Sequence, residues 1–311
     1  MRILVTGGAG FIGSHLVDAL MGNGDDVTIL DNLSSGSLEN LGSQSRSGFR
    51  FIRGDVRRSS DVRKATRNAD KVFHLAACVG KSITDSQRDF KTNALGTFNV
   101  LKASKENNVE RIVVASSVMI YGERKSRTAA SETDPPNPII PYGASKAAAE
   151  ACSLAFYHSW GVPVAVLMYF NVYGPRCDPR NPYSGVVSRF MGRALHGLPP
   201  LVYGDGLQTR DFVYVGDVVR ASLLAADRKK AVGQIINVGS GIGTPIAKLA
   251  SMVLKATSLE HLKVKHTSPR PHEYRHIHAD MAKARSILGY RPSVSLAQGL
   301  ARTWQYLQKT E

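Results

Sequence analysis

The sequence is poor in cysteine and has no long apolar run. Its 311 residues include three cysteines, Cys78, Cys152 and Cys177, which are too few and too scattered for a disulfide framework or a zinc site. No segment approaches the roughly 18 consecutive apolar residues of a membrane-spanning helix. The opening MRILVTGG has a short apolar run that ends in glycine, which indicates a strand rather than a signal peptide. We therefore expect a cytoplasmic protein without a metal site, built as one large or two modest domains.

Acidic residues are also comparatively few. The chain has 40 Lys and Arg against 25 Asp and Glu, which gives a formal net charge of +15. Such an excess raises the question of a polyanionic partner. However, the basic residues come in short pairs, such as Arg57-Arg58 and Lys229-Lys230, without a long tract or interleaved aromatic residues. This spread is typical of a solvated surface, and small phosphorylated ligands also use cations. We expect neither a nucleic-acid partner nor a membrane partner.

Short β-branched runs alternate with amphipathic helical stretches along the first half of the chain. The runs are 2–6, 26–30, 49–54, 71–75, 111–115 and 163–168. This alternation predicts an α/β fold with a doubly wound parallel sheet of the Rossmann type. Helical patterns follow near 216–227, 244–256, 280–289 and 295–308. We expect a nucleotide-binding domain over residues 1–170, a segment near 211–240 that returns to it with a strand at 235–240, and a smaller C-terminal α/β lobe over 171–311 that binds the substrate.

A glycine-rich turn follows the first predicted strand. Gly7, Gly10 and Gly13 are spaced so that the backbone can approach a pyrophosphate at the start of the next helix. Asp31 ends the second strand 18 residues after Gly13, where an acid binds an adenosine ribose. Because an acid there repels a 2′-phosphate, the pattern favours NAD over NADP. Asp55, which we place at the end of the third strand, can reach the adenine or cap a helix.

A tyrosine and a lysine lie four residues apart in the segment PYGASKAAAE. On a helix, Tyr142 and Lys146 share one face. The ammonium of Lys146 is expected to lower the pKa of Tyr142, so that the phenol can act as a base. Ser117 lies 25 residues upstream, just past the predicted fifth strand, where doubly wound folds place their ligands.

With these motifs in place, the chain resembles the extended short-chain dehydrogenases/reductases, and most of all their UDP-glucose/UDP-galactose 4-epimerase branch. The resemblance covers nearly the whole length. After the glycine turn, the motifs come in family order: DNLSSG (31–36), GDV (54–56), HLAA (74–77), SSVMIYG (116–122), YGASK (142–146), YFNVYGPR (169–176), GDGLQTRDFVYVGDV (204–218) and RPHEYRHIHAD (270–280).

The resemblance implies a site for NAD and a site for a sugar nucleotide. The implied catalytic residues are Ser117, Tyr142 and Lys146. The implied cofactor-binding residues are Gly7, Gly10, Phe11, Ile12, Gly13, Asp31, Asn32, Asp55, Val56, Leu75, Ala76, Ala77, Asn93, Ser116, Tyr142, Lys146 and Tyr169. The implied substrate-binding residues are Ser117, Asn171, Tyr203, Arg210, Arg270 and Glu273, to which Lys81 and Arg189 are added as cations that could face the sugar. The two arginines at 210 and 270 would hold the diphosphate.

The residues directly after Ser117 indicate the reaction. Related 4,6-dehydratases and decarboxylases carry an acid there, whereas this chain has Val118 and Met119. Elimination needs acid–base groups beyond the tyrosine, so the sequence favours reversible hydride transfer at C4, with Met119 packing under the nicotinamide. A hexuronate epimerase is the main alternative because Lys81 and Arg189 could meet a C6 carboxylate. A UDP-N-acetylhexosamine 4-epimerase, another NDP-sugar oxidoreductase and a non-enzymatic dinucleotide-binding regulator are further alternatives.

Two helices carry apolar positions that suit assembly. The stretches near 86–107 and 142–159 include Phe98, Leu101, Ala148 and Leu154 at helical spacing. By the family resemblance, these helices would form a four-helix bundle across a two-fold axis. We therefore expect a homodimer.

Overall fold

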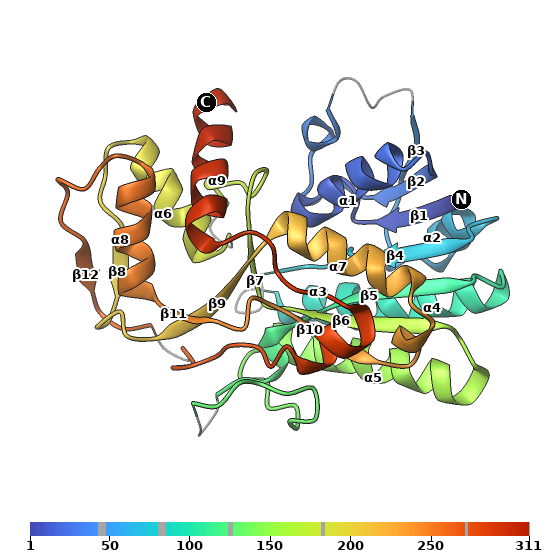
Figure 1. The fold of residues 1–311 in the computed structure, drawn as a ribbon. Helices are drawn as coiled ribbons and strands as arrows, with labels where there is room; N and C mark the ends of the chain where they lie inside the picture. The colour runs from blue at the N-terminus through green and yellow to red at the C-terminus, as the bar shows by residue number, and fades with distance from the viewer. Residues whose placement is uncertain (43–47, 80–84, 124–126, 182–183, 271–272, 311) are drawn as a thin grey trace.

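A seven-stranded parallel sheet forms the centre of the larger lobe (Figure 1). The computed structural model describes residues 1–42, 48–79, 85–123, 127–181, 184–270 and 273–310. The strand order is β10-β6-β5-β4-β1-β2-β3, and the prediction of a doubly wound sheet is confirmed. The strands are β1 (Arg2–Thr6), β2 (Asp26–Asp31), β3 (Phe49–Arg53), β4 (Lys71–His74), β5 (Arg111–Ser117), β6 (Val164–Tyr169) and β10 (Ile235–Val238). The order reverses between β1 and β4, and ligands of such sheets bind at this point.

Helices cover both faces of this sheet. One face packs against α1 (Phe11–Gly22) and α7 (Val215–Asp227). The other packs against α2 (Ser59–Thr66), α4 (Gly96–Glu106) and α5 (Pro141–Trp160). Shorter elements are α3 (Ser86–Phe90), a π turn η2 (Lys91–Leu95) that joins α3 to α4, and the turns η1 (Leu38–Leu41), η3 (Val118–Ile120), η4 (Lys229–Ala231) and η5 (Ala284–Leu288). Buried strands account for the continuous β-branched runs of the sequence.

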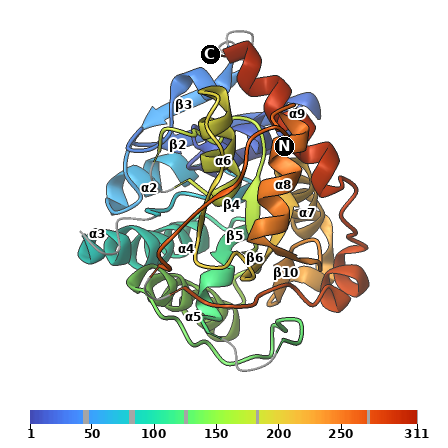
Figure 2. The ribbon, with the colours of Figure 1, turned by 90° about the vertical axis from the view of Figure 1, so that its left-hand side faces the viewer.

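The smaller lobe has its own apolar core. It contains a three-stranded sheet of β7 (Asn171–Tyr173), β9 (Thr209–Tyr214) and β11 (Gly243–Pro245), and a two-stranded sheet of β8 (Leu201–Tyr203) and β12 (Lys265–Thr267). The helices α6 (Val186–Leu195), α8 (Ile246–Ala256) and α9 (Leu296–Thr310) complete it. Seen from the side of this lobe, α6 and α8 lie in front of the large sheet (Figure 2).

Several element boundaries differ from the sequence prediction. Ser117 is the last residue of β5 rather than a loop residue, because it pairs with Tyr169 of β6. The strand β3 ends at Arg53, so Asp55 lies in the following turn. The segment 280–289 forms a π turn at 284–288 instead of a long helix. Among the described residues, no helix combines the length and the apolar character that crossing a bilayer requires.

Candidate active site

The glycine-rich turn brings the backbone of β1, α1 and β4 into close contact. Gly7 has a φ of +73°, and a Cβ on it would lie 2.7 Å from the amide nitrogen of Ala76. A Cβ on Gly13 would lie 2.1 Å from the carbonyl oxygen of Gly7. At the start of α1, no side chain caps the first turn, so its amide groups are available to a ligand. A helix start of this kind suits an anion such as a pyrophosphate.

Asp31 lies beside this turn at the end of β2. Its Oδ2 accepts a hydrogen bond from the Ala9 amide at 3.0 Å, and its Oδ1 accepts one from the Leu33 amide at 2.8 Å. Burial raises the pKa of Asp31, and these backbone bonds oppose the rise. A carboxylate offers about four acceptor positions, so the oriented side chain retains capacity to accept bonds from ribose hydroxyls.

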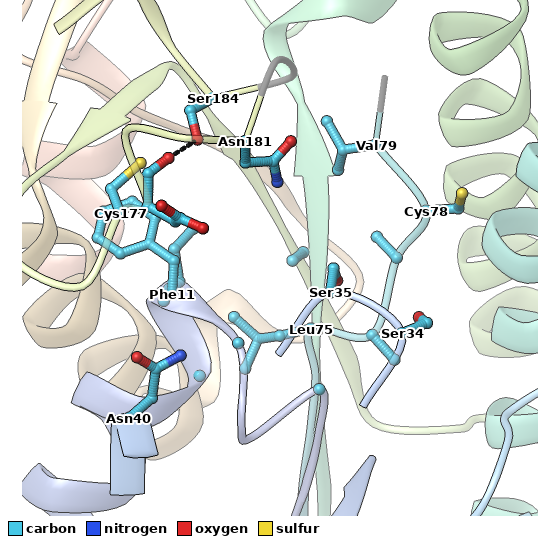
Figure 3. Close-up of a pocket in the computed structure, with 18 of the residues that line it drawn as sticks. Phe11, Ser34, Ser35, Asn40, Leu75, Cys78, Val79, Cys177, Asn181 and Ser184 are labelled. Carbon is cyan, nitrogen blue, oxygen red and sulfur yellow. Dashed lines mark hydrogen bonds between the residues drawn. The ribbon is translucent and has the colours of Figure 1, made fainter. Parts of the chain in front are cut away.

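A cavity of about 740 Å³ runs along this end of the sheet (Figure 3). In the close-up, Phe11 and Asn40 lie on one side of it, and Cys78 and Val79 on the other. Of the predicted cofactor-binding residues, the lining contains Gly7, Gly10, Phe11, Ile12, Gly13, Asp31, Asn32, Val56, Leu75, Ala76, Ala77, Ser116, Tyr142, Lys146 and Tyr169. The open helix start, the oriented carboxylate of Asp31 and this continuous lining fit a dinucleotide.

Two predicted cofactor residues do not line the cavity. The carboxylate of Asp55 is paired with Arg57 at 2.6 Å and accepts a bond from Asn32 at 2.9 Å, and the Arg57 guanidinium holds its pKa well below the usual range. Asn93, on the π turn, is fully buried. Its side chain bonds the backbone of Cys78 and the hydroxyl of Ser145. Both residues therefore support the lining from behind.

Ser117, Tyr142 and Lys146 come together on the wall of the same cavity. Burial raises the pKa of Tyr142 to about 12, and a hydrogen bond with Ser117 opposes the rise. Burial lowers the pKa of Lys146 to about 8, and its Nζ donates to the Ala115 carbonyl at 2.8 Å. The net direction for Tyr142 is therefore upward rather than the expected lowering, because desolvation is the largest cause and the hydrogen bond with Ser117 offsets only part of it.

A further buried acid, Glu150, lies beside the end of β5 that carries Ser116 and Ser117. Glu150 follows Lys146 by one helical turn, and its Oε2 accepts a hydrogen bond from Ser116 at 3.1 Å. Burial raises the pKa of Glu150 to about 7. Because Ser116 lines the cavity and Glu150 does not, this acid orients a lining hydroxyl without reaching the ligand space.

A second cavity of about 690 Å³ adjoins the first. The segment 179–185 contributes described residues to both linings. The second lining contains six predicted substrate residues, namely Asn171, Arg189, Tyr203, Arg210, Arg270 and Glu273. Ser117 lines the first cavity instead. The predicted Lys81 lies outside the described residues.

Arginines and tyrosines stack in pairs in the second cavity. The guanidinium of Arg270 lies 3.9 Å from the ring centre of Tyr203, and Arg189 donates to the Tyr203 hydroxyl at 3.3 Å. Both lower the pKa of Tyr203, Arg270 more strongly. Arg210 lies 4.0 Å from the ring centre of Tyr274 and pairs with Glu273 at 3.0 Å. These cations are oriented before any ligand arrives, which suits recognition of a diphosphate.

The sequence analysis missed Tyr274 and misplaced Met119. Met119 lines the second cavity, not the first. Tyr274 lines it as well and donates its hydroxyl to the Met119 sulfur at 3.1 Å. The only signal in the sequence was the position of Tyr274 directly after Glu273 in the motif RPHEYRH. In the part of the chain that is described, no group of three or more His, Cys, Asp or Glu could hold a metal ion.

Residues 3–239 match the NAD dependent epimerase/dehydratase family. The chain is 37% identical to a putative UDP-glucose 4-epimerase of Methanocaldococcus jannaschii over 98% of both chains. It is 36% identical to a UDP-N-acetyl-alpha-D-glucosaminuronate decarboxylase of Bacillus cytotoxicus, over 100% of this chain and 98% of the other. The protein therefore belongs to the NAD dependent epimerase/dehydratase family, and NAD is its cofactor.

Solved structures give the same result for the fold. The UDP-glucose 4-epimerase of Thermotoga maritima, crystallised with UDP-glucose, superposes with a TM-score of 0.94 at 38% identity, covering 100% of this chain and 99% of the other. The UDP-glucuronic acid 4-epimerase of Bacillus cereus, in complex with UDP-glucuronic acid and NAD, gives a TM-score of 0.91 at 33% identity, covering 100% of both. The relatives perform different reactions on different sugars, so the reaction has to be argued from the site.

Proposed function

We propose that this protein is a 4-epimerase of a UDP-sugar, with UDP-glucose and UDP-galactose as its substrates. The observation that carries the proposal is that neither of the two residues directly after Ser117 carries a carboxylate. Val118 is buried and Met119 is apolar. Among the described acids that line the two cavities, Asp31 and Glu39 belong to β2 and η1, Asp178 is paired with Arg180, and Glu273 is paired with Arg210. Dehydration across C5–C6 needs an acid and a base beyond Tyr142, and Val118 and Met119 supply neither.

The chain's own groups suffice for proton transfer at C4. Tyr142 would accept the proton of the C4 hydroxyl, and Ser117 would hydrogen-bond the same oxygen. NAD, when bound, supplies a reversible acceptor for the C4 hydride. Lys146 would bind the cofactor ribose and the glycine turn its pyrophosphate. Tyr142 would return the proton to the same oxygen when the 4-keto sugar is reduced on its opposite face, so no atom would be lost.

The second cavity suits a sugar that has to turn over. Arg210 and Arg270 would hold the diphosphate, while Met119 and Ile140 form an apolar part of the wall. Apolar side chains form no hydrogen bonds that would favour one face of the sugar. Arg189 is bonded to Tyr203, which stacks on Arg270. Arg189 therefore belongs to the same group of contacts as Arg270, which we assign to the diphosphate. This arrangement favours a neutral hexose over a hexuronate.

The test is a product assay without added NAD. The purified protein is incubated in turn with UDP-glucose, UDP-N-acetylglucosamine and UDP-glucuronate, and products are identified by proton NMR. We expect UDP-galactose from UDP-glucose at the highest rate, with no 4-keto-6-deoxy sugar and no pentose. A dehydrated or decarboxylated product, or no C4 epimer from any of the three, would contradict the proposal.

We also propose that the chain forms a homodimer through α3, η2, α4 and α5. Large apolar side chains are exposed there: Phe90 (53%), Leu95 (44%), Phe98 (40%) and Trp160 (55%). Leu101, which the sequence analysis assigned to this surface, is instead fully buried in the protomer's own core. Light scattering at micromolar concentration should give twice the monomer mass, and Phe98→Glu with Trp160→Glu should give the monomer. A wild-type monomer would contradict this assembly.

A further inference from the structure

The backbone of Met119 contacts both Ser117 and Gly143, the residue that follows Tyr142. Its amide donates a hydrogen bond to the Ser117 Oγ at 3.3 Å. Because Oγ accepts this bond, the serine hydroxyl proton is free to point toward another oxygen. The Met119 carbonyl approaches Gly143 so closely that a Cβ there would lie 2.5 Å from its oxygen. Gly143 follows Tyr142 directly, so a shift of Met119 moves the surroundings of both catalytic groups.

The side chain of Met119 is held from the smaller lobe. Tyr274 donates its hydroxyl to the Met119 sulfur at 3.1 Å and is only 6% exposed. The ring of Tyr274 makes a second contact, because the Arg210 guanidinium lies 4.0 Å from the ring centre. One tyrosine therefore contacts a cation through its ring and a catalytic-end residue through its hydroxyl.

Arg210 itself is fixed on several sides. Its Nη2 donates to Glu273 at 3.0 Å, and its Nη1 donates to the Thr209 carbonyl at 2.8 Å. The residue is 7% exposed, yet it lines the second cavity. An anion that binds this guanidinium competes with Glu273 and with the Tyr274 ring for the same charge. Anion binding at Arg210 therefore changes the force that orients Tyr274.

We propose that Tyr274 is a positioning residue that couples diphosphate binding at Arg210 to the catalytic end of β5 through Met119. The path runs from Arg210 to the Tyr274 ring, from the Tyr274 hydroxyl to the Met119 sulfur, and from the Met119 backbone to Ser117 and Gly143. This inference rests on the proposed function in one respect, because it takes the anion at Arg210 to be the substrate diphosphate. Its consequence is that the Ser117 and Tyr142 geometry is completed only when a sugar nucleotide is bound.

Steady-state kinetics of conservative variants test the coupling. Tyr274→Phe keeps the ring beside Arg210 and removes the hydroxyl, so we expect kcat to fall about tenfold while KM for UDP-glucose stays within about twofold. Met119→Leu removes the sulfur at similar volume and should give the same result. The double variant should be no worse than either single variant, because both remove one contact. Additive losses, or an unchanged kcat in both single variants, would overturn the coupling.

A matched control removes another buried tyrosine hydroxyl. Tyr290 is fully buried, and its hydroxyl has no hydrogen-bond partner among the described residues. Tyr290→Phe should therefore leave kcat and KM unchanged. Circular dichroism melting of every variant shows whether it folds. If Tyr274→Phe does not fold, Met119→Leu alone tests the coupling. Its kcat is expected to fall without a change in KM, and an unchanged kcat would overturn the coupling.

A second measurement does not depend on turnover. The chain has 7 methionines, whose methyl groups can be labelled with carbon-13, and the Met119 signal is assigned from its loss in Met119→Leu. Addition of UDP should shift this signal in the wild type but not in Tyr274→Phe, although calorimetry should show UDP binding to both. An unshifted wild-type signal with UDP bound would overturn the inference. A wild type that shows the shift but epimerises none of the three sugars would overturn the proposed function alone.

Discussion

The two cavities of this protein differ in whether backbone or side chains make their main contacts. The first cavity contains a turn built from backbone, with Gly7 and Gly13 at contacts that exclude a Cβ and with an open helix start at α1. The second cavity contains pairs of long side chains, in which Arg210 stacks on Tyr274 and Arg270 on Tyr203. The residues of the glycine turn are neighbours in sequence, whereas those of the second cavity come from several separate segments.

This difference teaches which site tolerates change. A backbone site depends on the absence of atoms, so one added methyl group disrupts it. A side-chain site depends on contacts between cations and aromatic rings, each of which contributes roughly 0.5–2 kcal/mol. We therefore expect the glycine turn of the first cavity to be more sensitive to a single substitution than the side chains of the second. The proposed catalytic residues Tyr142 and Lys146 line the first cavity, and burial is the largest cause of the shifts in their pKa values.

The largest effect is expected at the proposed catalytic residues on the wall of the first cavity. Tyr142→Phe should lower kcat by roughly 10²–10⁴-fold, because it removes the acid–base group. Affinities for NAD and for UDP should remain close to those of the wild type. Ser117→Ala should lose less, since the phenol still transfers the proton. Steady-state assays and calorimetry measure both quantities, and near-normal epimerisation by Tyr142→Phe would disprove the assignment.

A single added methyl group in the glycine turn should weaken NAD binding. In Gly13→Ala, the new Cβ meets the Gly7 carbonyl oxygen at 2.1 Å and forces the turn apart. We expect NAD affinity to fall by roughly a hundredfold, about 3 kcal/mol. The control is Gly22→Ala on the same helix, where nothing lies within 4 Å of a Cβ. Equal NAD affinity of the two variants by calorimetry would show that the turn does not bind the cofactor.

A charge-conserving change in the second cavity should have a smaller effect, on the KM for UDP-glucose. Arg210→Lys keeps the cation but loses the planar fork that pairs with Glu273 and stacks on Tyr274. KM for UDP-glucose should rise about tenfold, roughly 1.4 kcal/mol, while NAD affinity stays unchanged. Arg275→Lys is the control, because Arg275 pairs with exposed Asp205 and lines neither cavity. If both variants raise KM equally, general charge rather than geometry holds the substrate.

The last prediction concerns the free energy of unfolding rather than activity or ligand affinity, and it concerns Glu150, beneath the first cavity. The folded pKa of Glu150, about 7, lies above the ordinary value of 4.5 because of burial. The stability that this group contributes is therefore fully present below pH 4.5 and is lost as pH rises through 7. Glu150→Gln, which mimics the neutral acid, should stabilise the fold by about 3 kcal/mol at about pH 8 and by little at about pH 5. Thermal melts at both pH values check this, with exposed Glu260→Gln as control. A constant difference across the range would exclude titration of Glu150 as the cause.

Local patterns predicted the parts of the fold and of the site that depend on neighbours in sequence. The strand runs, the glycine turn and the one-face spacing of Tyr142 and Lys146 are all of this kind. The misplaced details depend on distant packing. Leu101 faces its own core, and Met119 faces the smaller lobe. Periodicity shows that a helix face is apolar but not which partner covers it.

The sequence by itself determined the cofactor class, because a turn without side chains and an acid after the second strand are properties of short segments. It also determined the absence of an acid after Ser117. Only the tertiary structure decided that burial raises the pKa of Tyr142 and lowers that of Lys146, since desolvation depends on all the atoms around a group. The tertiary structure also brought Tyr274 to Met119 across 155 positions of the chain, and no local sequence pattern encodes this contact.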